Sequence, residues 1–410
     1  MKRHPLTTTI GSYPVFPRHE DIEYYERMKS RGVDDVLDPF VWSTEEAVRD
    51  FFSSGIEVVS SGQTRGDLYS LFLDPAFVKG VVWEGSEAYV KKRIERLSSA
   101  RAADVRVARD ALPKQFEIKE PITDAYTLAK FLKLTTSTYR NVRELAIDVN
   151  RRIVIPEIED LQKEGLVSYI QLDSPQISAE SSPADYFVEL YENIMSVAKV
   201  PVVLHACGDT VRVFGMLAKT GVDVLSLDFY HYPKLMDEVG RRSFDQSLGI
   251  GALDAQSPRV ESVAEVSRVL ERARRLVGDR VKFVHPHCGQ RSLDRWVARE
   301  KNSVLTIARN DVFFGEARQA SLSRTPTVGV ESGYFLVQTK WETKEIIATY
   351  YSMDHSVLRR YRSVKAEAIL QSFNEDARRL GIDRGRLSYL ALELGRAEAA
   401  LGREQHSRSG

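Results

Sequence analysis

Two cysteines and a nearby histidine are the residues of this sequence best suited to bind a metal ion. His205 stands two residues before Cys207 at the end of a short apolar run, Cys288 follows another such run, and the chain has no other cysteine. Asp228 ends a third run of the same kind. Imidazole, thiolate and carboxylate groups are accepted ligands of Zn²⁺. The four side chains therefore predict a tetrahedral zinc site, which would lower the pKa of a thiol and supply a thiolate at neutral pH.

The same residues allow other interpretations. Two buried cysteines beside a hydrogen-bonded core histidine need no metal. A redox-active pair of Cys207 and Cys288 is a further alternative, although neither lies in a C-x-x-C motif. His231 competes with Asp228 for the metal, but Asp228 directly continues its apolar run. His287 is expected either to hydrogen-bond to a metal ligand or to lie in a surface loop.

The elements that would bring these residues together alternate over roughly the first 320 residues. Short apolar runs, several without the alternation of a half-buried strand, are separated by stretches of helical periodicity. Eight β-then-α units predict an α/β fold, a (β/α)8 TIM barrel. A doubly wound sheet is the alternative, although no G-x-G-x-x-G motif follows the first run. The eight strands are expected at residues 7–10, 57–60, 117–120, 168–172, 202–204, 224–227, 248–252 and 281–284.

The chain is expected to have two parts, the barrel at residues 1–322 and a mostly helical extension at residues 323–410. Helical periodicity in the barrel covers residues 86–111 and 262–276, and Ser262 with Glu265 forms a capping-box pattern. The extension should contain an extended segment at 325–338 and helices at 341–374 and 384–404. The basic stretch 359–362 is interpreted as a solvated helix face, with a docking surface for a partner as the alternative.

The overall composition excludes several classes of protein. The 410 residues include 58 Lys and Arg and 58 Asp and Glu, so the formal net charge is zero, which argues against a nucleic-acid-binding protein. The 43% of hydrophobic residues can form a substantial core. No apolar run approaches the roughly 18 residues of a membrane span, and no secretory signal is recognisable. We therefore expect a cytoplasmic enzyme.

Further polar residues follow the other predicted strands, and in a barrel these strand ends carry the active site. Asp173 could bind a substrate ammonium group, or else cap a helix or order a loop. Ser12 after Gly11 could offer its hydroxyl and backbone N–H groups to a carboxylate, or form a simple turn. Arg65 could hold an anionic substrate group or form a structural ion pair.

Taken together, these segments resemble the C-terminal catalytic domain of cobalamin-independent methionine synthase and its short, archaeal-type relatives. The matching residues occur in the order of the family across roughly residues 7–320: Ile10-Gly11-Ser12, Gly62-Gln63-Thr64-Arg65, Ile170-Gln171-Leu172-Asp173, His205-Ala206-Cys207-Gly208, Leu225-Ser226-Leu227-Asp228-Phe229, Asp254-Ala255-Gln256-Ser257-Pro258 and His287-Cys288-Gly289.

The resemblance implies a zinc-binding (β/α)8 barrel that transfers a methyl group to the sulfur of homocysteine. By position, His205, Cys207 and Cys288 match zinc ligands, and Asp228 stands where the family usually has glutamate. Asp173 and the turn formed by Ile10, Gly11 and Ser12 match contacts to the substrate amino acid, and Gln63 and Arg65 lie in the segment that follows the second strand.

Several positions depart from the pattern of the folate-dependent enzymes. Gln256 replaces a histidine thought to donate a proton, and glutamine cannot act as a general acid. The acidic residue that helps bind the homocysteine amine is replaced around Gln63. Ser174 follows Asp173 where the long enzymes have glutamate, Phe131 stands near the place of a folate-stacking tryptophan, and the N-terminal half of those enzymes has no counterpart.

These departures favour methylcobalamin on a corrinoid protein over methyl-folate as the donor, because a Co(I) leaving group needs no proton. The expected reaction is an in-line attack by the homocysteine thiolate, with the amine near Asp173 and the carboxylate near Ser12. One alternative is an enzyme that alkylates another thiol such as coenzyme M. Another is a non-catalytic barrel that serves as a binding partner. The C-terminal helices could cap the barrel, form a homodimer or dock a corrinoid protein.

Overall fold

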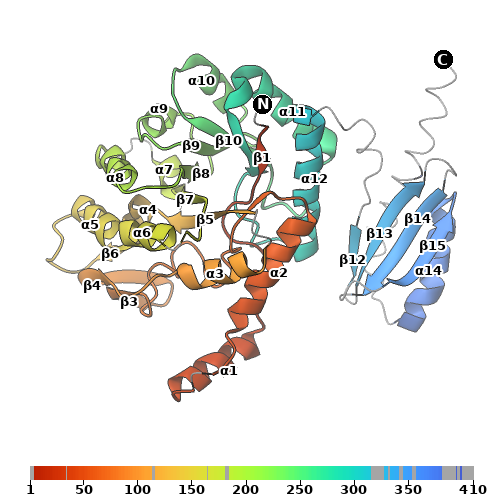
Figure 1. The fold of residues 1–410 in the computed structure, drawn as a ribbon, viewed down its shortest axis with the longest axis horizontal. Helices are drawn as coiled ribbons and strands as arrows, with labels where there is room; N and C mark the ends of the chain where they lie inside the picture. The colour runs from red at the N-terminus through yellow and green to blue at the C-terminus, as the bar shows by residue number, and fades with distance from the viewer. Residues whose placement is uncertain are drawn as a thin grey trace. The chain divides into compact units, whose positions relative to one another are not determined.

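The computed structural model describes residues 4–33, 35–112, 116–163, 165–180, 184–314, 327–330, 333–340, 345–352 and 357–380, together with Leu394 and Glu398. The chain divides into two compact units, Met1–Phe314 and Gly315–Gly410, which are described separately (Figure 1). Within the described residues, no helix combines the length and the apolar character that crossing a membrane requires.

The first unit is a closed barrel of parallel strands, as predicted, and not a doubly wound sheet. Its strand order is β1-β11-β10-β9-β8-β7-β5-β2, and the two ends meet where Thr8 forms a parallel bridge to Val58. The Thr8 hydroxyl donates a hydrogen bond of 2.7 Å to the Val58 carbonyl. All eight predicted strands are confirmed: β1 (Leu6–Thr7), β2 (Val58–Val59), β5 (Glu117–Thr123), β7 (Tyr169–Asp173), β8 (Val202–Ala206), β9 (Val224–Asp228), β10 (Ser247–Leu253) and β11 (Val281–Pro286).

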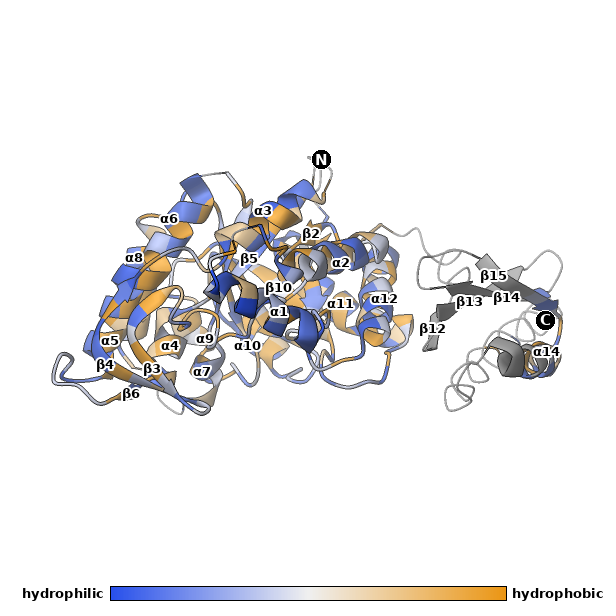
Figure 2. Ribbon diagram, turned by 90° about the horizontal axis from the view of Figure 1, so that it is seen from below, coloured by the Kyte–Doolittle hydropathy of each residue, from blue (hydrophilic) through white to orange (hydrophobic). Residues whose placement is uncertain are grey.

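Helices surround the barrel and carry both apolar and polar residues along their length (Figures 1 and 2). Helix α11 shows how local sequence defines them, because the Ser262 side chain accepts from the Glu265 N–H and Glu265 reciprocates, which confirms the predicted capping box. The helical elements of this unit are α1 (His19–Ser30), α2 (Pro39–Ser53), α3 (Ala102–Asp110), α4 (Ala125–Phe131), α5 (Val142–Val149), the π-helix η1 (Asn150–Val154), α6 (Ile155–Lys163), α7 (Pro175–Ala179), α8 (Tyr186–Met195), α9 (Phe214–Leu217), α10 (Leu235–Arg241), α11 (Val263–Val277), the 3₁₀-helix η2 (Gly278–Arg280) and α12 (Arg295–Phe314).

One predicted helix of the barrel unit is largely wrong. Of residues 86–111, only α3 is helical, and the earlier part forms strand β4 (Glu87–Arg96), which pairs with β3 (Val78–Glu84) and β6 (Lys133–Leu134). Gly85 adopts a φ of 64° in the turn between β3 and β4, a conformation that favours glycine. Val90 and Ile94, four residues apart, are both buried; a helix and a strand place such a pair on one face equally well, so the periodicity was ambiguous.

The inside of the barrel changes from apolar to polar along its strands. Near the amino ends, inward side chains form an apolar cluster of Val58, Tyr169, Val203, Val224 and Phe283. Because alternate residues of a strand share a face, the next inward residues lie two positions further on, and these are the buried polar residues Gln171, His205, Ser226 and His285. A further two positions lead to Asp173, Cys207, Asp228 and His287. The strands therefore deliver polar side chains to one end of the barrel.

The described part of the second unit is a four-stranded antiparallel sheet followed by a helix. The strands, in the order in which they pair, are β12 (Thr327–Val330), β13 (Gly333–Lys340), β14 (Glu345–Ser352) and β15 (Val357–Ser363), and the helix is α14 (Ala366–Leu380). The rings of Tyr361 and Phe373 meet edge to face with centroids 6.1 Å apart, which joins β15 to α14.

The prediction of a mostly helical extension is only partly right. The extended segment at 325–338 agrees with β12 and β13, and α14 is helical, but the helix predicted over 341–374 is wrong at β14 and β15. The run of β-branched and aromatic residues at 346–351 favours a strand. The basic stretch 359–362 therefore lies on a strand and not on a helix face. The predicted boundary between residues 322 and 323 lies outside the described residues, as does the helix at 384–404 apart from Leu394 and Glu398.

Gly251 on β10 leads to a prediction about stability. A Cβ atom at this position would lie 2.6 Å from the Leu227 carbonyl oxygen and 3.0 Å from the His287 Cα atom, which are both backbone atoms of neighbouring segments. We expect Gly251→Ala to lower the free energy of unfolding by about 1–3 kcal/mol, the usual cost of overpacking, as measured by urea denaturation.

The matched control for this substitution is Gly240→Ala in α10. There the nearest atom to a new Cβ would be a leucine methyl at 3.5 Å, and alanine favours a helix over glycine by up to about 1 kcal/mol. Equal effects of the two substitutions on unfolding would contradict the close packing of β10 between its neighbours.

Candidate metal and substrate site

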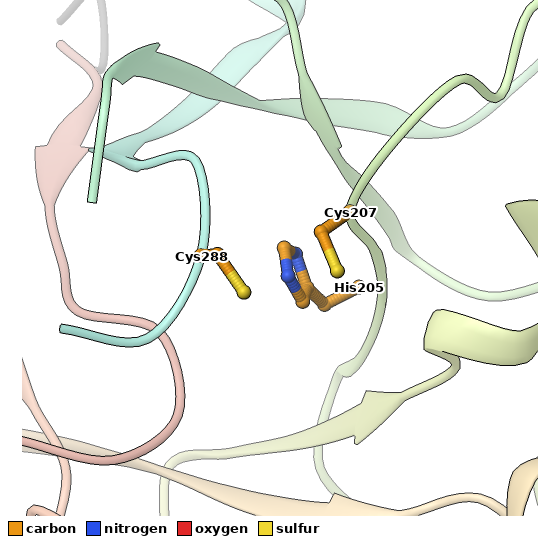
Figure 3. Close-up of side chains that lie close together, drawn as sticks. All are labelled: His205, Cys207 and Cys288. Atoms are coloured by element: carbon orange, nitrogen blue, oxygen red, sulfur yellow. The ribbon is translucent and has the colours of Figure 1, made fainter. Parts of the chain in front are cut away.

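The two cysteines and His205 gather at the carboxyl end of the barrel, although Cys288 is far from the others in sequence. His205 lies on β8, Cys207 directly follows that strand, and Cys288 follows β11. One nitrogen of His205 and both sulfur atoms lie within 4.8 Å of one another. Figure 3 shows the two thiols and the imidazole directed into the same space from these two strand ends. Three of the four predicted metal ligands thus form one group.

The hydrogen bonds of His205 leave one ring nitrogen free. Its Nδ1 lies 3.1 Å from the backbone carbonyl of Ser226, and a carbonyl can only accept, so Nδ1 carries the proton. Burial lowers the pKa of His205 well below its usual value, so the ring is neutral. The buried Nε2 has no hydrogen-bond partner. A buried lone pair without a partner, close to two sulfur atoms, fits a metal ligand.

The two thiols form a hydrogen bond with each other. A hydrogen bond to Cys288, together with burial, raises the pKa of Cys207, and the same hydrogen bond lowers the pKa of Cys288. Two thiols this close lose their protons one after the other, the second with more difficulty, whereas a divalent cation would stabilise both as thiolates. The donor set of one imidazole and two sulfurs therefore fits zinc, which accepts both kinds of ligand.

Asp228, the fourth predicted ligand, belongs to a neighbouring group with His231 and His287. Its carboxylate accepts the His231 backbone N–H at 3.0 Å and lies 3.0 Å from His231 Nδ1. His231 Nε2 is 3.4 Å from Asp254. His287 is buried and its Nδ1 accepts from the Ala255 N–H at 2.8 Å, so it is not a surface-loop residue. To act as a ligand, the Asp228 carboxylate would have to replace its contact with the His231 ring by a contact with the metal.

Asp173 lies at the end of β7 beside a fully buried lysine. Lys119 donates hydrogen bonds to the Thr9 carbonyl at 2.8 Å and to the side-chain carbonyl of Gln171. Because lysine can only donate, this contact turns the Gln171 amide so that its nitrogen donates to the Asp173 carboxylate at 2.6 Å. Burial raises the pKa of Asp173 to about 7, and burial lowers that of Lys119 to about 7. Lysine and glutamine thus hold one oxygen of Asp173 in place.

The predicted substrate residues of the first two loops also lie together. The Ser12 hydroxyl donates to Gln63 Oε1 at 3.2 Å, and the Ser12 carbonyl accepts from the Gln290 N–H at 2.8 Å, two residues after Cys288. Gly11, after the buried Ile10, turns the chain with a φ of 52°. The buried Gln63 adopts a φ of 47°, a strained conformation for this residue, and its Nε2 has no partner. Its amide therefore has an unused donor beside Ser12.

Two other predicted site residues are placed differently. Arg65 pairs with Asp38 at 2.7 Å and with Asp104 at 2.9 Å, and its guanidinium lies over the Phe40 ring. This arrangement favours a structural ion pair over an anion-binding role. Gln256 is exposed, and its backbone N–H donates to Asp254 at 2.8 Å in the turn that follows β10.

Sequence reasoning missed the roles of Lys119, Ser226 and His285, which lie inside the barrel. Ser226 and His285 were visible only as polar residues within largely apolar strands, and Lys119 only as one of several polar residues of β5. Such a residue at an inward position must find a partner, and that rule was the available signal. The partners themselves come from other strands and could not be inferred.

The fold and the site together define a class: a closed (β/α)8 barrel with an imidazole, two thiols and buried polar residues at the carboxyl ends of its strands. A family model described as the catalytic domain of cobalamin-independent synthase matches residues 5–309. The chain belongs to the cobalamin-independent methionine synthase family through this domain, and the match ends before the second unit.

Individual relatives agree with this placement. The chain is 29% identical over 310 residues to a methionine synthase of Methanothermobacter thermautotrophicus, covering 74% of this chain and 99% of the relative. It is 26% identical over 308 residues to one of Methanocaldococcus jannaschii, covering 72% and 96%. A solved B12-independent methionine synthase from Shewanella sp. W3-18-1, in complex with selenomethionine, superposes with a TM-score of 0.64 at 19% identity, covering 76% of this chain and 98% of that chain.

The group of His205, Cys207 and Cys288 leads to a prediction about metal binding. We expect Cys207→Ser and Cys288→Ser each to lower the affinity for Co²⁺ or Zn²⁺ by more than the roughly 10–100-fold that loss of an outer hydrogen-bond partner causes. Cobalt titration, followed by sulfur-to-metal absorbance, measures this directly. Asp279→Asn, at an exposed carboxylate before the amino end of β11, is the control and should retain the affinity; full retention in both cysteine variants would contradict the site.

Proposed function

We propose that this protein is a zinc-dependent methyltransferase that moves a methyl group from a methyl-corrinoid donor to the thiol of homocysteine and so forms methionine; methyl-folate is the second candidate donor. The observation that carries the proposal is the unpartnered Nε2 of His205 beside two thiols. Membership of the family and relatives named methionine synthase support the same reaction.

His205, Cys207 and Cys288 would hold the zinc. When bound, zinc lowers the pKa of a thiol substrate, so that the sulfur reacts as a thiolate at neutral pH. Asp228 is a candidate fourth ligand, and its hydrogen bonds to His231 would keep it available without leaving its charge unpaired.

The surrounding residues can orient the substrate through its amino acid end. Asp173 has one carboxylate oxygen held by Gln171, which leaves the other for the substrate ammonium. Ser12 and the free Nε2 of Gln63 offer donors for the substrate carboxylate. Two anchors of opposite polarity fix the direction of the substrate, and with it the position of its sulfur near Cys288. This arrangement would lower the entropy cost of an in-line attack.

In the transfer step, the homocysteine sulfur forms a bond to the methyl carbon as the bond from methyl to donor breaks. The electron pair of that bond stays on the donor. A Co(I) corrinoid needs no proton at this point, whereas a reduced folate nitrogen does. Gln256 cannot supply that proton, because an amide is not a general acid. The corrinoid would act as a second substrate and not as a resident cofactor.

The surroundings of Phe131 also support a corrinoid donor. Its ring stacks on Tyr69 with centroids 4.0 Å apart, and Trp83 lies 5.7 Å away. One face of the ring is therefore covered by the protein itself, which reduces its value as a platform for a pterin. Arg65 bears on the alternative thiol: because two carboxylates neutralise it, it is poorly placed to bind the sulfonate of coenzyme M, and homocysteine is favoured.

The direct test is methyl transfer to homocysteine by the zinc-loaded protein, with methylcobalamin and methyl-folate compared as donors and methionine measured as product. We expect turnover with methylcobalamin and little with methyl-folate. Turnover with coenzyme M in place of homocysteine would reassign the thiol. No turnover with either donor or thiol, in protein that binds zinc, would favour the non-catalytic alternative.

Asp173→Asn should selectively weaken the binding of thiols that carry an amine. A hydrogen bond between charged groups contributes about 1.5–3 kcal/mol, so we expect the KM for homocysteine to rise about 10–150-fold. The KM for 4-mercaptobutyrate, which lacks the amine, should change little in the same variant. Similar losses for both thiols would show that Asp173 does not bind the ammonium group.

The pKa of Asp173 leads to a prediction about pH. Burial raises this pKa to about 7, so below pH 7 the carboxyl gains a proton and loses its attraction for an ammonium group. Binding of methionine, whose thioether does not titrate, should therefore strengthen as the pH rises from 6 to 7 and level off above it. Calorimetry on the wild type and on Asp173→Asn tests this, because the variant lacks the carboxyl and should keep only the smaller dependence that comes from Lys119.

A further inference from the structure

His285 is a fully buried histidine that the proposed reaction does not use. It lies on β11, one inward layer below the thiols, and its exposed fraction is 0%. Its Nδ1 is 2.8 Å from the Pro286 carbonyl, and its Nε2 is 2.8 Å from the hydroxyl of Ser226 on β9. The same hydroxyl lies 3.3 Å from Nδ1 of His205 on β8. Side chains from three strands thus form one chain of hydrogen bonds that ends at a candidate metal ligand.

The direction of each hydrogen bond follows from what each group can donate. The Pro286 carbonyl can only accept, so His285 Nδ1 carries a proton. In a neutral ring, a proton on Nδ1 leaves Nε2 as the acceptor. With Nδ1 protonated, the Ser226 hydroxyl is the donor to Nε2, and the backbone of Gly249 is a further hydrogen-bond partner of this ring. The remaining lone pairs of the Ser226 hydroxyl, together with the Ser226 carbonyl, face His205 Nδ1 and accept a proton from it.

This series of hydrogen bonds favours one tautomer of His205. Because His205 Nδ1 keeps its proton, the lone pair of the neutral ring lies on Nε2, the atom that has no partner beside the cysteines. If His285 did not accept the Ser226 proton, that hydroxyl could donate to His205 Nδ1 and compete there with the Ser226 carbonyl, which only accepts. The other tautomer of His205 would then become available, and it presents an N–H group, which cannot bind a metal.

The backbone at Gly249 leaves space for the hydrogen bond between Ser226 and His285. A Cβ atom on Gly249 of β10, between Ser226 and His285, would lie 2.8 Å from His285 Nε2 and 3.1 Å from the Ser226 Cβ. A larger residue would separate the two hydrogen-bonded groups. Three neighbouring strands therefore contribute to the contact: a serine, a glycine and a histidine.

We propose that His285, acting through Ser226, is a positioning residue that holds His205 in the tautomer able to bind a divalent metal. This role rests on the proposed metal site for its purpose, but the tautomer itself is a property of the metal-free protein. The residue would act on the metal without contacting it, and it would also limit the rotation of the His205 ring.

The test compares His285→Leu, which removes the acceptor, with His285→Gln, which restores a carbonyl acceptor for Ser226. In metal-free protein, ¹⁵N NMR of the histidine rings should show His205 protonated on Nδ1 alone in the wild type and in His285→Gln. In His285→Leu, both tautomers should be populated. Zinc affinity, measured by competition with a chelator, should fall about 10–100-fold in His285→Leu and only a few-fold in His285→Gln.

Tyr169→Phe is the matched control, because Tyr169 lies inside the same barrel in the apolar cluster and takes no part in this chain. It should leave both the tautomer and the zinc affinity unchanged. An unaltered His205 tautomer in a folded His285→Leu variant overturns the positioning role. A wild-type protein with this tautomer that binds no zinc overturns the proposed function instead, so the two failures are distinguishable.

Discussion

The two-residue repeat of the strands, closed into a barrel, is the constraint on which the rest of this structure depends. Every second side chain of each strand is directed into a confined interior, and moving two positions along a strand moves one layer along the barrel. Tyr169, Gln171 and Asp173 show this sequence of apolar, polar and charged residues on one strand. Because neighbouring strands follow the same progression, polar groups meet at the carboxyl end over an apolar base.

Closing the polar layers away from water forces each group to find a partner within the barrel. Burial of an unpaired polar group costs free energy, and the hydrogen bonds from Lys119 through Gln171 to Asp173 avoid that cost. Against this background, the atoms left without partners are informative. His205 Nε2 and Gln63 Nε2 are two such atoms among the described residues, and the proposed function gives them a metal ion and a substrate carboxylate as partners.

The parts of the fold that sequence reasoning predicted correctly are those with redundant local signals. Eight apolar runs separated by stretches of helical periodicity indicated the barrel, and Ser262 with Glu265 marked the start of α11. Strand β4 and strands β14 and β15 of the second unit were mistaken for helices. In both places the strands pair with neighbours of their own small sheets. In β4 the buried Val90 and Ile94 are four positions apart, a spacing that fits a helix as well as a strand.

The sequence by itself determined which chemical groups are available: two thiols, an imidazole and several carboxylates at the ends of strands, in the order typical of one family. Only the tertiary structure decided how those groups are used. In the folded chain, Cys288 lies beside His205 and Cys207. Asp228 hydrogen-bonds to His231, and Arg65 forms ion pairs with two carboxylates. The physical reason is that hydrogen bonds and ion pairs act over a few ångströms, and their partners come from strands far apart in the chain, whose register is set by the closed barrel.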